Sequence, residues 1–477
     1  MSTIKNYING EWVDGQKTAD NINPANTNDV INQYAEGNAA DIDNAVQAAS
    51  NAFPAWRDST LQVRHDLLDA IGNAILERKE EFGAVLAREE GKTLPEAIGE
   101  TVRAGQVFKF FAGEALRFGG ELIRSVRPDV DVDIIRESLG VVGLITPWNF
   151  PIAIPAWKMA PALAFGNCVV FKPAPATPGT SCILAQLFEE FGGPPGVLNM
   201  VMGDGAEVGD ALVSHKDVAA ISFTGSVKTG RGIIASCAAS QKKVQVEMGG
   251  KNPMIVMEDA DLSIAVPACI NGAFFSTGQR CTASSRFVVH EQVHDEFVAA
   301  VLEGMEKLRI GDPLQETTDI GPVIDARQLN SNLRYVALAA EEGATVHGGE
   351  RLELENPGYY QASALFTQTS NDMRINQEEI FGPCASVIKV GDFDEAITVA
   401  NDVEFGLSSG ICTTSLKYAR EFKRRADAGV LMVNLPTAGL DYHVPFGGRK
   451  ASGYGPKEQG RYAVEFYTMV KTAYTYA

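Results

Sequence analysis

The sequence of 477 residues has few of the features that mark secreted, membrane-spanning or zinc-stabilised proteins. Its seven cysteines are odd in number, widely spaced and never in a C-x-x-C pair, which argues against disulfides and structural zinc. The most apolar window, residues 150–171, contains three prolines, a lysine and an asparagine, so it cannot cross a bilayer as one unbroken apolar helix. This window is predicted to be buried core.

Positive charge is also scarce. There are 41 basic against 60 acidic residues, a net charge of −19, and no block of five or six Lys or Arg. Attraction to nucleic acid or to anionic lipid is therefore not expected, and an anionic substrate would need a local basic site. The segment Met1–Tyr7 lacks the apolar stretch of a secretory signal, which predicts a cytoplasmic protein.

The composition, 45% hydrophobic and 21% charged, is typical of a globular protein, and the length suggests about three domains or lobes. Residues 41–118 have helical periodicity, with Leu67, Leu68, Ile71 and Ile75 on one face. From residue 140 onward, short apolar runs alternate with helix-length segments, which is typical of β-α-β units and parallel sheets. Two doubly wound α/β domains are predicted, with a boundary near Gly249 and Gly250.

Strand candidates in the first series are Gly140–Ile145, Cys168–Phe171, Val197–Val201, Ala219–Phe223, Val244–Val246 and Met254–Val256, and in the second Arg286–Val289, Ala344–His347, Ala385–Val390, Ser409–Thr413 and Gly429–Val433. Two further segments, Val126–Ile135 and Phe466–Thr472, alternate polar and apolar residues without a nearby hairpin partner. Such isolated strands predict sheet extension between subunits, and so a homodimer or homotetramer.

Residues 290–294 match H-E-x-x-H, the pattern of zinc proteases. A strand is expected to end at His290 and a helix to begin after it, so the two imidazoles would lie on either side of a turn, not on one helical face. No metal site is predicted.

Two glycine clusters follow strand candidates, at Gly203–Gly209 and Gly225–Gly230. Neither fits G-x-G-x-x-G or a complete P-loop, and each alone is explained by a turn. However, Gly225 and Ser226 stand where the backbone N–H groups of a helix start could hold a pyrophosphate, so dinucleotide binding is a reasonable hypothesis.

Three residues are candidates for chemistry. Cys281 lies in a polar, glycine-containing loop next to Arg280, whose charge would favour the thiolate, although a loop cysteine is usually unreactive. Glu247 ends a strand candidate, where α/β folds build their sites, or is a solvated strand-end charge. Asn149 lies in the rigid turn after a strand, as an oxyanion donor or as a simple Asx turn.

Taken together, these segments resemble the aldehyde dehydrogenase superfamily over almost the whole chain. The matching motifs are Pro147-Trp148-Asn149-Phe150-Pro151, Phe171-Lys172-Pro173, Phe223-Thr224-Gly225-Ser226, Glu247-Met248-Gly249-Gly250-Lys251, Gly278-Gln279-Arg280-Cys281 and Glu379-Ile380-Phe381-Gly382-Pro383. The resemblance implies a nucleotide-binding domain (1–120 and 140–249), a catalytic domain (250–450) and a small β oligomerisation domain (121–139 and 462–477).

The resemblance also implies roles. Cys281 would be the nucleophile that forms a thiohemiacetal and then a thioester, Asn149 an oxyanion donor, and Glu247 the base that activates water. The residues implied in binding NAD or NADP are Trp148, Lys172, Gly225, Ser226, Glu379 and Phe381. Pro175 stands where many NAD-specific members have a glutamate, which leaves NADP open.

At a finer level, residues 433–450 and 276–283 are similar to the α-ketoglutaric semialdehyde (2,5-dioxopentanoate) dehydrogenase group, although groups acting on succinic semialdehyde or sulfonated aldehydes share much of this pattern. Arg280 and Arg103 are the candidate partners for a substrate carboxylate. Each has an ordinary alternative, pairing with an acidic neighbour for Arg280 and solvation for Arg103. The rival functions are a cofactor-independent cysteine hydrolase, a coenzyme A-acylating enzyme and a scaffold protein.

Overall fold

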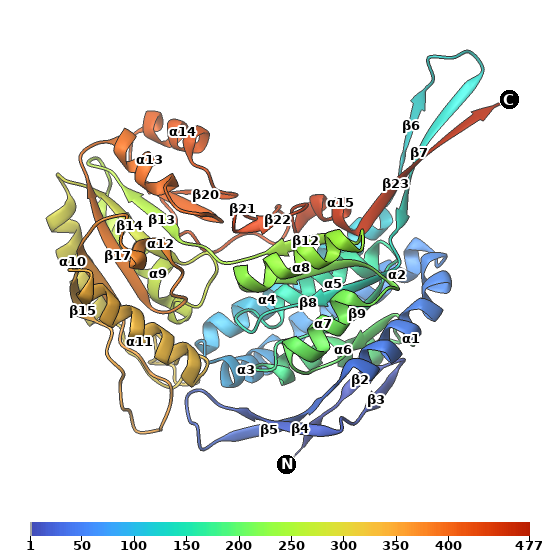
Figure 1. The fold of residues 1–477 in the computed structure, drawn as a ribbon, viewed down its shortest axis with the longest axis horizontal. Coiled ribbons are helices and arrows are strands. Elements are labelled where there is room, and N and C mark those ends of the chain that lie inside the picture. Colours follow the sequence, from blue (N-terminus) through green and yellow to red (C-terminus); the bar gives the residue numbers. More distant parts are fainter. Residues whose placement is uncertain (1) are drawn as a thin grey trace.

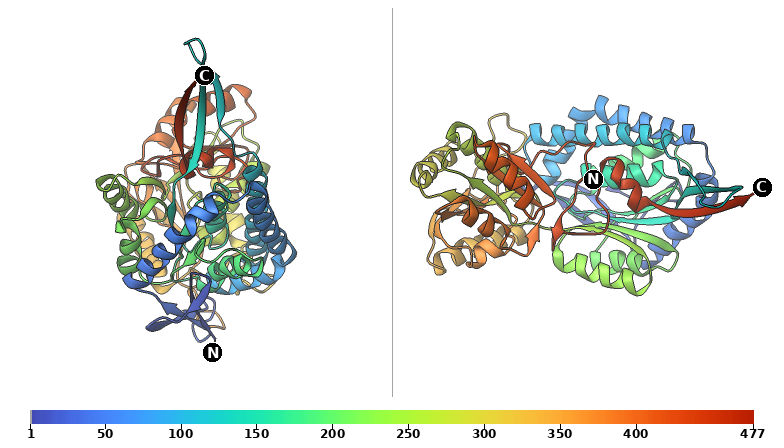
Figure 2. Two further views of the ribbon diagram at one scale, coloured as in Figure 1. Left: turned by 90° about the vertical axis from the view of Figure 1, so that its right-hand side faces the viewer. Right: turned by 90° about the horizontal axis from the view of Figure 1, so that it is seen from above.

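The computed structural model describes residues 2–477 and shows two α/β lobes side by side, with a narrow β arm projecting from one of them (Figures 1 and 2). The first lobe is built on a sheet of strand order β22-β12-β11-β8-β9-β10-β2-β3. These strands are Gly453–Tyr454, Lys243–Glu247, Val218–Thr224, Val141–Ile145, Cys168–Lys172, Leu198–Met200, Asn6–Ile8 and Glu11–Val13.

Strands β12, β11, β8, β9 and β10 run parallel, which brings their carboxyl ends to one edge of the sheet. The helices of this lobe are α1 (Ala39–Arg57), α2 (Leu61–Glu77), α3 (Lys79–Glu90), α4 (Leu94–Leu116), α5 (Ala153–Ala164), α6 (Pro178–Glu190), α7 (Asp210–Ser214) and α8 (Val227–Ala239), with a π-helical turn η1 (Gly205–Gly209). The predicted helical layer is confirmed by α1–α4. The predicted core window forms the fully buried helix α5 and strand β9.

The second lobe has a sheet of strand order β15-β16-β17-β14-β13-β19-β20. Its strands are Thr345–Gly348, Ala364–Thr369, Cys384–Val390, Ser284–His290, Asn252–Val256, Ser408–Cys412 and Val430–Val433. Its helices are α9 (Leu262–Phe274), η2 (Phe275–Gly278), α10 (His294–Glu306), α11 (Ala326–Glu341), α12 (Arg374–Gln377), α13 (Phe393–Asn401) and α14 (Leu416–Arg425). The predicted strands are confirmed, and β16 was missed because its second half, Thr367-Gln368-Thr369, is polar.

The chain then returns to the first lobe. Strand β22 pairs antiparallel with β12, and the short helices η3 (Gly460–Ala463) and α15 (Val464–Tyr467) lead into the arm (Figure 1). Short strands complete the fold: β1 (Thr3–Ile4), β5 (Val30–Glu36) and β4 (Lys17–Ile22) form one sheet, and β18 (Phe405–Gly406) pairs with β21 (Arg449–Lys450). This return path places the segment between β20 and β22 next to both lobes.

The arm is a sheet of β6 (Glu121–Arg124), β7 (Val130–Ser138) and β23 (Thr468–Tyr476). The prediction that the segment 126–135 has no nearby hairpin partner is wrong. Strand β7 forms a hairpin with β6 and pairs along its whole length with β23, because the carboxyl-terminal segment returns to it from far along the sequence. The arm still exposes large apolar side chains, among them Leu122 at 77% and Tyr476 at 79%.

No helix among residues 2–477 has the length and apolar character needed to cross a membrane. His290 is the last residue of β14 and His294 the first of α10, so the two histidines of the H-E-x-x-H match lie on either side of a turn, as predicted. Within the described residues, no group of three or more His, Cys, Asp or Glu side chains is placed to hold a metal ion.

Candidate active site

The carboxyl edge of the first sheet gathers several of the residues singled out in the sequence. Lys172 ends β9, Thr224 ends β11 and Glu247 ends β12, while Trp148 and Asn149 lie in the loop after β8. Because these strands are parallel neighbours, the residues after them lie at one edge. This edge faces the second lobe, from which Cys281 approaches in the loop between η2 and β14.

A cavity of about 300 Å³ lies beside Cys281 and is lined by residues of helix α4 and of the loop that carries the cysteine. Aromatic rings of Phe150, Trp157 and Phe446 form part of its wall. Five charged side chains also line it: Lys92, Glu96, Glu100, Arg103 and Arg280. The cavity is therefore suited to a small, partly apolar molecule that carries a charge.

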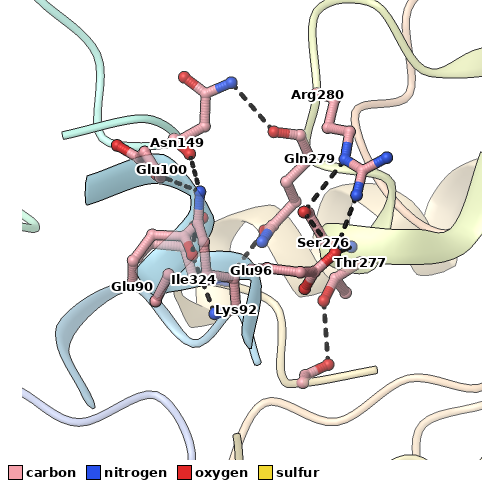
Figure 3. Close-up of polar contacts among 12 residues, drawn as sticks. Glu90, Lys92, Glu96, Glu100, Asn149, Ser276, Thr277, Gln279, Arg280 and Ile324 are labelled. Atoms are coloured by element: carbon pink, nitrogen blue, oxygen red, sulfur yellow. Dashed lines mark hydrogen bonds and ion pairs between the residues drawn. The ribbon is translucent and has the colours of Figure 1, made fainter. Parts of the chain in front are cut away.

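Asn149 connects the two lobes at this point. Its side-chain amide donates to the carbonyl oxygen of Gln279 at 3.0 Å, two residues before Cys281 (Figure 3). Its backbone carbonyl accepts from the buried Lys92 ammonium at 2.7 Å, and Lys92 also pairs with Glu100 at 2.7 Å. A side-chain amide carries two N–H donors, so Asn149 keeps a second donor beside the cysteine loop.

The carboxylates of Glu247 and Glu379 lie near the cysteine loop, each packed against glycine backbone. The backbone N–H of Gly448 donates to Glu247 at 2.9 Å, and that of Gly250 donates to Glu379 at 2.9 Å. A side chain at Gly447 would collide with the Glu247 carboxylate, and one at Gly249 would collide with that of Glu379. Gly447 and Gly249 therefore leave room for the carboxylates of Glu247 and Glu379.

The residues singled out for the cofactor line the adjoining edge. Trp148 and Phe381 meet edge to face, with ring centroids 5.5 Å apart. Ser226 caps helix α8, accepting from the backbone N–H of Thr229, directly after Gly225. Lys172 is buried, and Glu379 lies between Gly250 and the loop of Phe381. This edge therefore brings together the start of helix α8, the buried ammonium of Lys172 and the aromatic pair of Trp148 and Phe381.

The whole-chain comparison agrees with this geometry. The sequence pattern described as the Aldehyde dehydrogenase family matches residues 12–473. The chain belongs to the aldehyde dehydrogenase family. It is 44% identical to an α-ketoglutaric semialdehyde dehydrogenase of Bacillus subtilis, covering 99% of this chain and 98% of that one. It is 42% identical to an α-ketoglutarate semialdehyde dehydrogenase of Haloferax volcanii, over 98% of both chains.

Solved structures agree on the fold. The crystal structure of betaine aldehyde dehydrogenase from Staphylococcus aureus in complex with NAD+ superimposes with a TM-score of 0.97 at 36% identity, covering 99% of this chain and 95% of that one. The predicted aldehyde dehydrogenase fold and the predicted oxidoreductase class are confirmed.

Burial dominates the electrostatics of this aldehyde dehydrogenase site. Desolvation, together with the nearby carboxylates of Glu379 and Glu247, raises the pKa of Cys281 to about 12. Desolvation, together with the neighbouring carboxylate of Glu458, raises the pKa of Glu247 to about 8. Desolvation also raises the pKa of Glu379 to about 7. The three groups are therefore all shifted toward their uncharged forms.

A buried polar network behind Glu247 was not predicted from the sequence. Lys158, in the otherwise apolar helix α5, forms an ion pair with Glu458 and donates to Ser222 at 2.8 Å. The indole N–H of Trp157 donates to Glu458 at 2.8 Å. The signal was present: a lysine inside a window predicted as buried core needs a buried acidic partner.

The two candidate arginines differ in their surroundings. Arg280 donates to Glu96 at 2.8 Å and to Ser276 at 3.0 Å, so it pairs with an acidic neighbour, the ordinary alternative considered for it. Arg103 is half-buried, not solvated, and its guanidinium lies 5.6 Å from the ring centroid of Trp157. It donates to the backbone carbonyl of Leu440, and to the side-chain oxygen of Gln459 at 2.8 Å. Both arginines line the cavity beside Cys281.

Proposed function

We propose that this aldehyde dehydrogenase oxidises a small aldehyde with a carboxylate at its far end, such as 2,5-dioxopentanoate, to the corresponding acid with NAD or NADP. The charge balance of the cavity beside Cys281 carries the proposal. The relatives named for α-ketoglutaric semialdehyde support it.

The cavity has one more cation than anions among its lining side chains. Glu96 pairs with Arg280, and Glu100 pairs with Lys92 at 2.7 Å. Arg103 is left without a carboxylate at ion-pair distance among residues 2–477, and its buried Nε atom has no hydrogen-bond partner there. Arg103 is therefore the favoured partner for the substrate carboxylate, and Arg280 is not.

The proposed chemistry begins at the sulfur atom. The thiolate of Cys281 adds to the aldehyde carbon, and the resulting oxyanion accepts hydrogen bonds from the second N–H of Asn149 and from the backbone N–H of Cys281. A bound nicotinamide dinucleotide supplies the acceptor for the hydride that leaves this carbon. Glu247 then takes a proton from water, which attacks the thioester and releases the acid together with the Cys281 thiolate.

The edge of the first sheet fits such a dinucleotide. The buried hydroxyls of Thr146 and Thr224, after β8 and at the end of β11, have no hydrogen-bond partner among the described residues. The Lys172 ammonium donates to the carbonyl of Pro173 at 2.9 Å, and desolvation lowers its pKa to about 8. Buried polar atoms without partners are costly, so a ligand that hydrogen-bonds to them is expected.

We therefore propose that Lys172 and Glu379 bind the riboses of the dinucleotide, that Gly225 and Ser226 hold its pyrophosphate at the start of α8, and that Trp148 and Phe381 pack beside it. We also propose the predicted division into a nucleotide-binding domain (1–120 and 140–249), a catalytic domain (250–450) and oligomerisation strands (121–139 and 462–477). The exposed apolar side chains of the arm support a homodimer or homotetramer.

The test measures absorbance at 340 nm with a panel of aldehydes and either nucleotide. The panel contains 2,5-dioxopentanoate, succinic semialdehyde, a sulfonated aldehyde and an uncharged aldehyde of similar length. The expected result is the highest kcat/KM for an ω-oxo acid. A preference for the uncharged aldehyde, or ester cleavage without any aldehyde oxidation, would contradict the proposal and favour another aldehyde or a cysteine hydrolase.

A further inference from the structure

Helix α4 places two carboxylates, Glu96 and Glu100, one turn apart at the wall of the substrate cavity (Figure 3). We propose that Glu96 is a positioning residue for Cys281, and that Glu96 and Glu100 together make α4 a common support for the cysteine loop and the Asn149 loop. This inference rests on the proposed function, because it assigns the two loops to one reacting centre.

Glu96 uses both of its oxygens. One oxygen accepts from the backbone N–H and the hydroxyl of Ser276, each at 2.9 Å, and from Arg280 at 2.8 Å. The other accepts from the backbone N–H of Thr93 at 3.2 Å and from its hydroxyl at 3.0 Å, which caps the start of α4. A single carboxylate thus attaches the cysteine loop of the second lobe to the first turn of a helix in the first lobe.

The cysteine loop needs such an attachment because its backbone is strained. Ser276 has φ 51° and ψ 33°, and Thr277 has φ 57° and ψ 28°, in the left-handed region that side chains disfavour, strongly so for a β-branched residue. Gly278 follows with φ 64°, and a side chain there would collide with the carbonyl of Gly382. Backbone in this conformation persists only where surrounding contacts hold it, and Cys281 is three residues further on.

Glu100 supports the other loop, which carries Asn149. One of its oxygens accepts from the backbone N–H groups of Ile152 and Ala153, both at 3.1 Å, at the start of α5. The other pairs with Lys92, whose ammonium also donates to the backbone carbonyl of Asn149 at 2.7 Å. Residues four apart lie on one face of a helix, so α4 fixes the separation of the two loops that the Asn149 to Gln279 hydrogen bond joins.

The test compares Glu96→Gln with wild type and with Glu114→Gln, a matched control on the same helix whose carboxylate pairs with Arg117 at the surface. Glutamine keeps the size of Glu96 but replaces an acceptor oxygen by a donor group that faces the donors of the loop. Two quantities are measured: kcat and KM with an aldehyde, and the rate of Cys281 alkylation by iodoacetamide between pH 6 and 10, which requires neither aldehyde nor nucleotide.

The expected result for Glu96→Gln is a kcat lowered by about tenfold to a hundredfold at unchanged KM. Alkylation should be at least threefold faster, since a loosened loop exposes the thiol to water. General destabilisation would also speed alkylation of the six other cysteines, which are buried, so peptide mapping must show that the faster alkylation is confined to Cys281. Unchanged kcat and alkylation, or a parallel fall of both, would overturn the proposal, and Glu114→Gln should match wild type in both measurements.

If Glu96→Gln does not fold, Ser276→Ala carries the test, because it removes only the hydroxyl contacts to Glu96 and Arg280. The same opposite changes, smaller in size, are then expected, and wild-type values of kcat and alkylation would overturn the proposal. A wild-type enzyme whose Cys281 is alkylated but that oxidises no aldehyde would refute the proposed function instead, so the two failures are distinguishable.

Discussion

Replacing Arg103 with alanine should reduce turnover of a carboxylate-bearing aldehyde far more than that of a neutral one. The other cations of the cavity, Lys92 and Arg280, are neutralised by Glu100 and Glu96, so Arg103 alone offsets the substrate charge among the described lining side chains. Opposite charges about 4 Å apart attract by about 4 kcal/mol at an effective dielectric constant of 20. After desolvation, a loss of about 2–4 kcal/mol is expected, or about 30- to 900-fold in kcat/KM.

The assay is a comparison of wild type, Arg103→Ala and Arg103→Lys with 2,5-dioxopentanoate and an uncharged aldehyde of the same length. Lysine keeps the charge without the planar pair of donors, so its loss should be intermediate. Removing Arg103 also leaves Leu440 and Gln459 without their donor, and the neutral aldehyde measures that structural cost. Equal losses with both aldehydes would refute carboxylate recognition by Arg103.

The other predictions concern the nucleophile, the base, the nucleotide and the assembly. Cys281→Ala should abolish turnover but keep nucleotide binding, measured by calorimetry, because only the covalent step is lost. Glu247→Gln should keep a burst of reduced nucleotide with a slow steady state, and wild-type kcat should rise with pH through about 8, as the raised pKa of a base that acts after hydride transfer requires. NADP should be accepted as well as NAD, and a preference for NAD above about a thousandfold would contradict this. Light scattering should give a multiple of the 51.2 kDa chain mass, and a monomer would count against the assembly proposed for the arm.

The sequence predicted most of the two sheets because buried parallel strands are continuous apolar runs. Strands with polar positions escaped this pattern. Strand β16 was missed, as was the sheet of β1, β5 and β4, whose side chains are partly exposed. The partner of β7 was missed for another reason: β23 lies some 330 residues further along the chain, and no local pattern predicts pairing over that distance.

The same limit applies to the site. Cys281, Glu247 and Asn149 stand in short local motifs, so the sequence alone singled them out. Glu96 is 180 residues from Ser276, which it contacts, and the sequence around Glu96 is an ordinary helix start. Only the folded chain shows that its carboxylate serves as a helix cap and as an attachment for the cysteine loop.

Burial sets the resting protonation state of the proposed nucleophile. The raised pKa values, about 12 for Cys281 and about 8 for Glu247, favour the thiol and the carboxylic acid at pH 7. Cys281 must therefore lose its proton before it attacks the aldehyde, and the resting thiol is weakly nucleophilic. The burial that shapes the cavity therefore also keeps the resting Cys281 thiol uncharged.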